Sequence, residues 1–169
     1  IQSAGGERTQ RWEWVHRGAN QTDRGQFTRS ELVDWLSGCA LLVRTSAFPD
    51  QGFDERFFTY NEETDLAYRL GQAGWKILFS PRARIWHKGV QRNYHPGANV
   101  TYYMARNQLM LLQKNHAPLW VRAYHWLKIL RTLAAWTFKL KWKNQREHRQ
   151  ALAQAAQDYL FNKSGKRNG

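Results

Sequence analysis

Short apolar runs alternate with one amphipathic stretch in the first half of the chain, and this pattern constrains the fold most. In residues 59–74, Leu66, Leu70 and Ala73 recur at i, i+4 and i+7, and Gly74 is well placed to end a helix. The run at 39–43 before this helix, and "WKILFSP" and "ARIWH" after it, are short enough for strands. The order strand, helix, strand, strand predicts an α/β or α+β fold rather than a helical bundle.

The first thirty residues are rich in glycine, polar groups and arginine, with brief alternation around Trp12 and Trp14. They predict a short strand and a long, irregular surface loop. The 169 residues suffice for one domain, and because the sequence opens at Ile1 without a signal-peptide pattern, we expect a segment of a longer protein. The single Cys39 excludes an internal disulfide and a cysteine-based zinc site, which favours a reducing compartment.

The second half predicts helices. "NVTYYMARNQLMLLQKNH" has helical spacing, and Pro118 separates it from an amphipathic stretch over 119–144. Its polar residues lie near one side of the expected helix: Arg122, His125, Lys128 and Arg131. Its apolar residues lie largely on the opposite side: Trp120, Leu127, Leu130 and Leu133 or Ala134. It lacks the ~20 uncharged apolar residues of a spanning helix, so we expect it to lie on a membrane. Within it, "WTFKLKWK" alternates with period two, so strand and helix compete there. A helix over 146–161 and a disordered basic tail over 162–169 complete the prediction.

The net charge of +13 and the nine tryptophans favour an anionic partner, which could be nucleic acid, lipid head groups or sugar phosphates. Nucleic acid is the less favoured of these, because no helix-turn-helix, finger or RNP pattern is present. From Arg122 onward the sequence contains eleven Lys and Arg residues, and its only acidic residues are Glu147 and Asp158. Basic residues mixed with Trp and Leu suit an anionic membrane surface. A membrane-docking module without catalysis, with 1–116 as scaffold, is a further alternative.

Carboxylates gather in "GFDERFFTYNEETDLAYRL", at Asp54, Glu55, Glu62, Glu63 and Asp65. Thr59 and Glu62 have the spacing of a capping box, and acidic residues in a first helical turn are stabilised by the helix dipole. Asp65 and Arg69 have the i, i+4 spacing of an ion pair.

The same carboxylates have aromatic neighbours, Phe57, Phe58, Tyr60 and Trp75. Apolar walls beside paired carboxylates raise one pKa, which suits a general base. Adjacent helical residues point about 100° apart, so Glu62 and Glu63 cannot both cap the helix and both face one cleft. One of the two is therefore available for chemistry.

Four stretches, in this order and spacing, carry a family resemblance: "WLSGCALLVRTSAF", "GFDERFFTYNEETDLAYRL", "GWKILFSPRARIWHKG" and "TYYMARNQLMLLQKN". Together they resemble the C-terminal half of a bacterial, rhamnosyltransferase-like glycosyltransferase of family 2, closely over residues 33–116. The resemblance implies a GT-A fold, which is a Rossmann-like α/β sandwich. Residues 1–116 then form its acceptor-side half, 117–161 a basic amphipathic helical extension, and 162–169 the tail. The implied reaction is inverting transfer of a sugar such as rhamnose from a nucleotide sugar to a hydroxyl of a polysaccharide or lipid-linked glycan.

The resemblance also implies roles for particular residues. Glu63 matches the general base, with Glu62 as the alternative and Asp65 in support. Gly38 and Cys39 match the floor beneath the donor sugar, although Cys39 also reads as a buried strand residue. His87 matches a position beside the divalent metal or the diphosphate, and Lys88 could neutralise phosphate; a structural histidine and a solvated lysine are the alternatives. Substrate contacts are also expected from Trp35, Tyr60, Arg106 and Asn107. The alternative for Trp35 is a place in the hydrophobic core. The alternative for Arg106 and Asn107 is that they pack their helix on the sheet.

Two features of a complete nucleotide-sugar site are absent from the sequence. It contains no Asp-x-Asp metal motif and no glycine-rich phosphate loop. We therefore expect a Mg²⁺ or Mn²⁺ ion to be held mainly by residues outside this chain, and the chain alone to be inactive. The expected location is cytoplasmic, peripheral on the inner face of a bacterial plasma membrane, in surface glycan synthesis.

Overall fold

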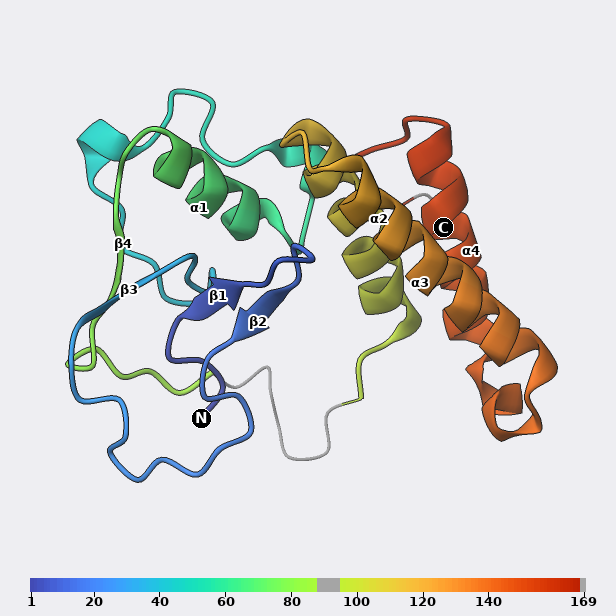
Figure 1. Ribbon diagram of the computed structural model, residues 1–169, viewed down its shortest axis with the longest axis horizontal. Coiled ribbons are helices and arrows are strands. Elements are labelled where there is room, and N and C mark those ends of the chain that lie inside the picture. The colour runs from blue at the N-terminus through green and yellow to red at the C-terminus, as the bar shows by residue number, and fades with distance from the viewer. Residues whose placement is uncertain (88–94, 168–169) are drawn as a thin grey trace. The chain divides into compact units, whose positions relative to one another are not determined.

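The computed structural model describes residues 1–87 and 95–167, and the chain forms two compact units (Figure 1). Among the described residues, unit 1 comprises 1–54 and 62–87, and unit 2 comprises 55–61 and 95–167. The sequence suggested a boundary at residue 116. The structure instead assigns the helix before that boundary to the same unit as the helices after it.

Unit 1 combines two small antiparallel sheets with one helix. β1 (Gly6–Arg8) pairs with β2 (Trp14–His16), and β3 (Glu31–Val33) pairs with β4 (Ile77–Phe79). α1 spans Glu62–Gln72, and Gly74 follows it with φ of 85°, in the left-handed conformation that favours glycine after a helix. The predicted helix and its terminating glycine are thus confirmed, as is the mixed α/β character of the chain.

Aromatic side chains and one face of α1 make the core of unit 1. Trp12, Trp35 and Leu66 are buried. The ring of Trp12 lies 5.2 Å from that of Tyr68 on α1, and the Arg8 guanidinium lies 4.5 Å from the Trp12 ring centre. Tyr68 of α1 therefore packs against the N-terminal hairpin, and Leu66 of the predicted apolar face is buried in the same unit.

Two predicted strands are wrong. Residues 39–43 are irregular, Cys39 is exposed, and the Leu42 side chain is 99% exposed. Residues 83–87 are also irregular, with Trp86 88% exposed. A strand needs a neighbour to satisfy its backbone N–H and C=O groups. Among the described residues no strand pairs with either segment, and the described sheets are two-stranded and antiparallel rather than Rossmann-like.

Unit 2 is helical and begins with a short 3-10 turn at Glu55–Phe57. α2 (Ala98–Lys114), α3 (Leu119–Phe138) and α4 (Arg146–Leu160) follow, and a 3-10 segment (Leu140–Gln145) links the last two. The predicted helices are confirmed, and the ambiguous "WTFKLKWK" is divided between the end of α3 and this link. None of the helices in the described ranges is long and apolar enough to cross a bilayer.

The helices of unit 2 pack through two apolar clusters. In one, Tyr102 and Tyr103 of α2 contact Ala151 and Ala155 of α4. In the other, Leu109 of α2 meets Ile129 of α3 and Leu152 of α4. α2 and α4 therefore both contribute to the two clusters, and α3 joins them in the second.

The orientation of α3 differs from the amphipathic prediction. Its buried residues are Val121, His125 and Ile129, whereas Leu127 and Leu130 are exposed. His125 was expected near the polar side with Arg122, Lys128 and Arg131. Because α3 is apolar on two faces, packing against α2 and α4 selects the face at i, i+4 and i+8 that includes His125, and leaves the other face outside.

The C-terminal tail differs from the expected disorder over residues 162–167. The Gly165 amide donates to the Arg56 carbonyl at 2.7 Å, and the Arg167 amide donates to the Tyr103 hydroxyl at 2.8 Å. The Arg167 guanidinium also donates to Gln154 Oε1, at 2.9 Å from Nε. The tail is thus held against α2, α4 and the 3-10 turn within unit 2.

Candidate functional site

The start of α1 carries the two glutamates that the sequence singled out. Helix α1 begins at Glu62, so Thr59 lies three residues before its first helical residue rather than immediately before it. The predicted capping box is therefore wrong, because its glutamate should be the third helical residue. Glu62, Glu63 and Asp65 do lie in the first turn, where the helix dipole favours negative charge.

The carboxylates of Glu62 and Glu63 each have an oxygen without a hydrogen-bond partner among the described residues. In both residues this atom is Oε2, and it is buried. Burial raises the pKa of Glu62; a backbone hydrogen bond opposes the rise and the charge of Glu63 adds to it. Buried polar atoms in proteins usually have partners, so such a pair is a candidate for contact with a ligand.

Glu63 lies against the backbone of Gly38. A Cβ placed on Gly38 would stand 3.6–3.8 Å from the Cβ, Cγ and Cδ of Glu63. Of the two residues expected beneath a donor sugar, Gly38 therefore lies beside the candidate base. Cys39 is exposed, not the buried strand residue that was the alternative, and its sulfur lies 3.3 Å from Ser37 Oγ.

Asp65 supports the helix. Its side chain is fully buried and accepts a hydrogen bond from Arg69 Nε at 2.8 Å, which confirms the predicted i, i+4 pair. Arg69 Nη2 also donates to the Gly52 carbonyl at 2.8 Å. The pair thus joins α1 to the preceding loop.

Trp35 belongs to the core of unit 1. It is 5% exposed, and its ring centre lies 4.7 Å from that of His16. A Cβ on Gly6 would clash with its Nε1 atom at 1.9 Å, so the β1 backbone covers this edge of the indole. The core interpretation therefore holds, and the ring offers little surface for stacking on a sugar.

Among the described residues, His87 is not part of an assembled metal centre. His87 is exposed, with Nδ1 3.1 Å from Gln2 Oε1. Within residues 1–87 and 95–167, no group of three or more His, Cys, Asp or Glu side chains could hold a metal ion. Lys88 lies outside the described residues.

The turn that precedes α1 in the chain has an uncommon backbone. Phe58, Tyr60 and Asn61 have φ angles of 64°, 64° and 72°, in the left-handed region that non-glycine residues rarely adopt. Such conformations cost about 1–3 kcal/mol each and persist when surrounding contacts impose them. Sequence reasoning missed this turn, since Phe and Tyr carry no preference for positive φ.

Arg106 and Asn107 of α2 impose this backbone. Asn107 Nδ2 donates to the carbonyls of Phe57, Thr59 and Tyr60 at 2.9, 2.7 and 2.7 Å. Arg106 Nη2 lies 3.3 and 3.2 Å from the carbonyls of Arg56 and Phe57. Both side chains are buried, and they clamp the turn at 56–60, while their contact with substrate stays a prediction. Tyr60 is half-buried and packs against the cluster of Tyr102 and Tyr103.

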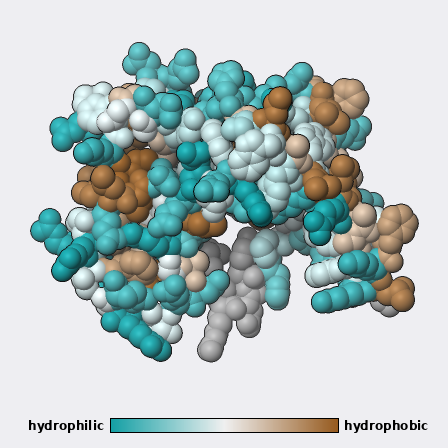
Figure 2. Space-filling view, in the orientation of Figure 1, coloured by the Kyte–Doolittle hydropathy of each residue, from teal (hydrophilic) through white to brown (hydrophobic). Residues whose placement is uncertain are grey.

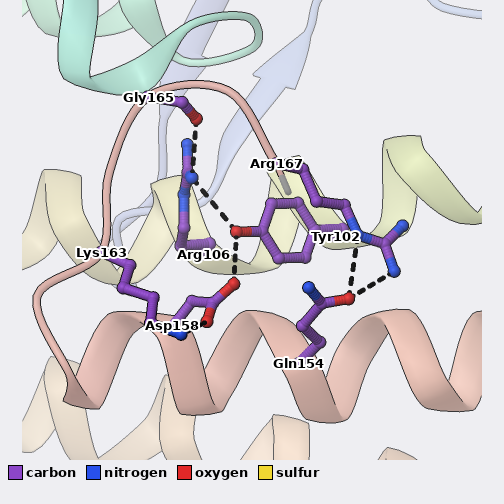
Figure 3. A network of polar contacts seen from close by, with 7 residues as sticks. All are labelled: Tyr102, Arg106, Gln154, Asp158, Lys163, Gly165 and Arg167. Atoms are coloured by element: carbon purple, nitrogen blue, oxygen red, sulfur yellow. Dashed lines mark hydrogen bonds and ion pairs between the residues drawn. The ribbon is translucent and has the colours of Figure 1, made fainter. Parts of the chain in front are cut away.

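A buried polar network supports the clamp (Figure 3). Arg106 Nη1 donates to the Tyr102 hydroxyl at 3.2 Å and to the Gly165 carbonyl at 2.8 Å, and the Tyr102 hydroxyl donates to Asp158 Oδ2 at 2.8 Å. Burial, followed by the hydrogen bond to Asp158, raises the pKa of Tyr102. Lys163 Nζ lies 3.3 Å from Asp158 Oδ1. The network joins α2, α4 and the tail around the arginine.

The chain is similar in sequence to bacterial rhamnosyltransferases, as the four motifs suggested. Over 95 residues it is 38% identical to the N-acetylglucosaminyl-diphospho-decaprenol L-rhamnosyltransferase of Mycobacterium tuberculosis H37Rv. The aligned residues make up 56% of this chain and 31% of that protein. Over 57 residues it is 40% identical to the rhamnosyltransferase WbbL of Escherichia coli K12. The aligned residues make up 33% of this chain and 22% of that protein. The chain thus spans about a third or less of these relatives. No family model and no solved structure matches it.

Proposed function

We propose that this chain supplies the acceptor-side part of an inverting glycosyltransferase of family 2 with a GT-A fold. The enzyme transfers a sugar such as rhamnose from a nucleotide sugar to a hydroxyl of a polysaccharide or lipid-linked glycan. The observation that carries this proposal is the Glu62–Glu63 pair, with a buried and unpartnered carboxylate oxygen on each residue among the described residues. The similarity to rhamnosyltransferases supports the same reading.

In the proposed reaction Glu63 removes the proton from the acceptor hydroxyl. As that oxygen bonds to the anomeric carbon, the bond from this carbon to the departing diphosphate oxygen breaks on the opposite face, which inverts the configuration. No covalent enzyme intermediate is required. Glu62 is the alternative base, because its raised pKa favours proton uptake.

A divalent metal ion belongs to the proposal through the family resemblance. The described residues do not bring together enough ligands to hold it, so no step above depends on it. His87 is the ligand that we propose this chain offers, and the remaining ligands would come from elsewhere.

The base assignment predicts different consequences for the two glutamates. In an active enzyme that contains this sequence, Glu63→Gln should lower transfer at least ~100-fold, the usual contribution of a general base. Glu62→Gln should lower it less than about tenfold if Glu63 is the base. Transfer is measured with a panel of nucleotide sugars, a lipid-linked glycan acceptor and Mg²⁺.

The control is Glu55→Gln, which removes an exposed carboxylate from the same acidic cluster. Circular dichroism and Tm establish that each variant is folded. Normal transfer by folded Glu63→Gln would show that this residue is not the base, and normal transfer by both variants would show that the carboxylates serve the helix alone.

A further inference from the structure

An exposed apolar stripe runs along α3, opposite the face that packs in unit 2. Trp120, Leu127 and Leu130 are 57%, 54% and 57% exposed. Ala123 and Ala134 fall on the same face by helical spacing. Exposed Phe138 and Leu140 lie at its C-terminal end. Figure 2 shows hydrophobic surface on the part of unit 2 that the C-terminal helices form.

Positive charge borders this stripe without acidic residues in the same segment. Residues 119–146 contain seven Lys and Arg and no Asp or Glu, and no acidic residue occurs between Asp65 and Glu147. Lys128 and Arg131 are exposed on the turns between the stripe residues, and Lys139 and Lys141 are exposed beyond the end of α3. Large exposed apolar patches mark interaction sites, and the positive charge beside this stripe is complementary to an anionic surface.

We propose that the outer face of α3 binds the surface of an anionic lipid bilayer. The helix lies parallel to the membrane, with Trp120, Leu127 and Leu130 at the boundary between head groups and acyl chains. The basic residues beside the stripe contact the phosphates of the lipid head groups. Helices with an apolar face and basic polar residues bind in this manner. This inference stands independently of the proposed sugar transfer, because it rests on a different part of the chain.

Two other occupants fit the stripe less well. A second copy of the chain in a two-fold symmetric contact would bring the same face of each copy together. The basic residues beside the stripe would then approach their own equivalents, without a carboxylate in the segment to offset them. A nucleic acid would satisfy the charges but would leave Leu127 and Leu130 against phosphate and water. A lipid surface satisfies both the apolar and the charged groups.

Binding to vesicles tests this proposal directly. The 169-residue chain is sedimented with sucrose-loaded vesicles of phosphatidylcholine alone and of phosphatidylcholine with phosphatidylglycerol. Leu127→Gln with Leu130→Gln removes the centre of the stripe. The matched control, Leu32→Gln with Leu78→Gln, removes two leucines of similar exposure, 61% and 53%, from the β3–β4 pair of unit 1.

We expect binding to the anionic vesicles that weakens with added KCl. The affinity of the stripe variant for these vesicles should be at least about tenfold lower than that of the parent chain. The control variant should bind as the parent chain does. If the stripe variant loses helical circular dichroism, Lys128→Gln with Arg131→Gln replaces it, with about a fivefold loss for each charge.

Three results would overturn the proposal. The first is the absence of binding to anionic vesicles, and the second is equal binding by the folded stripe variant. The third is a dimer, measured by light scattering, that the stripe variant converts to a monomer, since a second copy would then cover the stripe. None of these results bears on the role of Glu63.

Discussion

At the scale of single residues, burial and the helix dipole act on the Glu62 carboxylate in opposite directions. The first turn of a helix favours a carboxylate by about 0.3–1 kcal/mol at an exposed position. Glu62 is half-buried, and burial is the largest influence on its pKa, which is raised from 4.5. Its ionised form is therefore less favourable in the folded protein than in the unfolded chain.

This difference predicts a pH-dependent gain of stability for Glu62→Gln. A carboxyl group with a raised folded-state pKa contributes its stability below the unfolded pKa and loses it as pH rises through the folded value. The variant should therefore have a higher Tm than the parent at pH 7, and the gain should shrink as pH falls to about 4.5 and below. Thermal unfolding from pH 3.5 to 7.5 measures this. A gain that is equal across this range would contradict the pKa assignment.

At the scale of elements, α2 determines the conformation of the turn at 56–60. The left-handed residues Phe58 and Tyr60 are unfavourable by themselves, and the buried Asn107 amide binds three carbonyls of the same turn. Glu62 follows this turn directly in the chain. Arg106 and Asn107 are therefore positioning residues of the turn rather than residues shown to contact a ligand.

Asn107→Ala should destabilise unit 2 by about 2–4 kcal/mol, because three carbonyls of the turn lose the donor that they share. Chemical denaturation followed by helical circular dichroism measures this value. The matched control is Asn115→Ala at the end of α2, where Nδ2 donates to the Leu111 carbonyl at 3.0 Å, and where we expect a loss of about 1 kcal/mol or less. Equal losses in both variants would show that the turn does not depend on the clamp.

At the scale of the whole chain, the tail completes the buried network of unit 2. The carbonyl of Gly165 accepts from Arg106 Nη1, and its amide donates to Arg56. Arg106 is 1% exposed, so removal of this acceptor leaves a buried cation with fewer partners. The basic tail is thus a structural part of the unit.

Truncation after Phe161 should therefore destabilise unit 2 by about 1–3 kcal/mol, the usual cost of an unsatisfied buried group. This corresponds to about 2–4 °C in Tm for each kcal/mol. Lys166→Ala, an exposed change within the tail, is the control and should leave Tm within about 1 °C. An unchanged Tm after truncation would show that the tail contacts contribute no stability.

Local patterns alone determined the helices. Helical spacing and Gly74 located α1, and Pro118 separated α2 from α3, because i, i+4 periodicity and helix termini depend on neighbouring residues. The pair Asp65–Arg69 was predictable for the same reason. The four motifs also predicted the similarity to rhamnosyltransferases, since they are local sequences.

Only the tertiary structure decided the features that depend on distant partners. The apolar run at 39–43 reads as a strand, but a strand requires a paired neighbour, which local sequence does not specify. The spacing of α3 shows two apolar faces, and packing with α2 and α4 selected the one that contains His125. Trp35 became core because the β1 backbone at Gly6 covers its ring. Likewise, Arg106 and Asn107 hold a turn some 50 residues earlier in the chain, a contact that long-range packing alone creates.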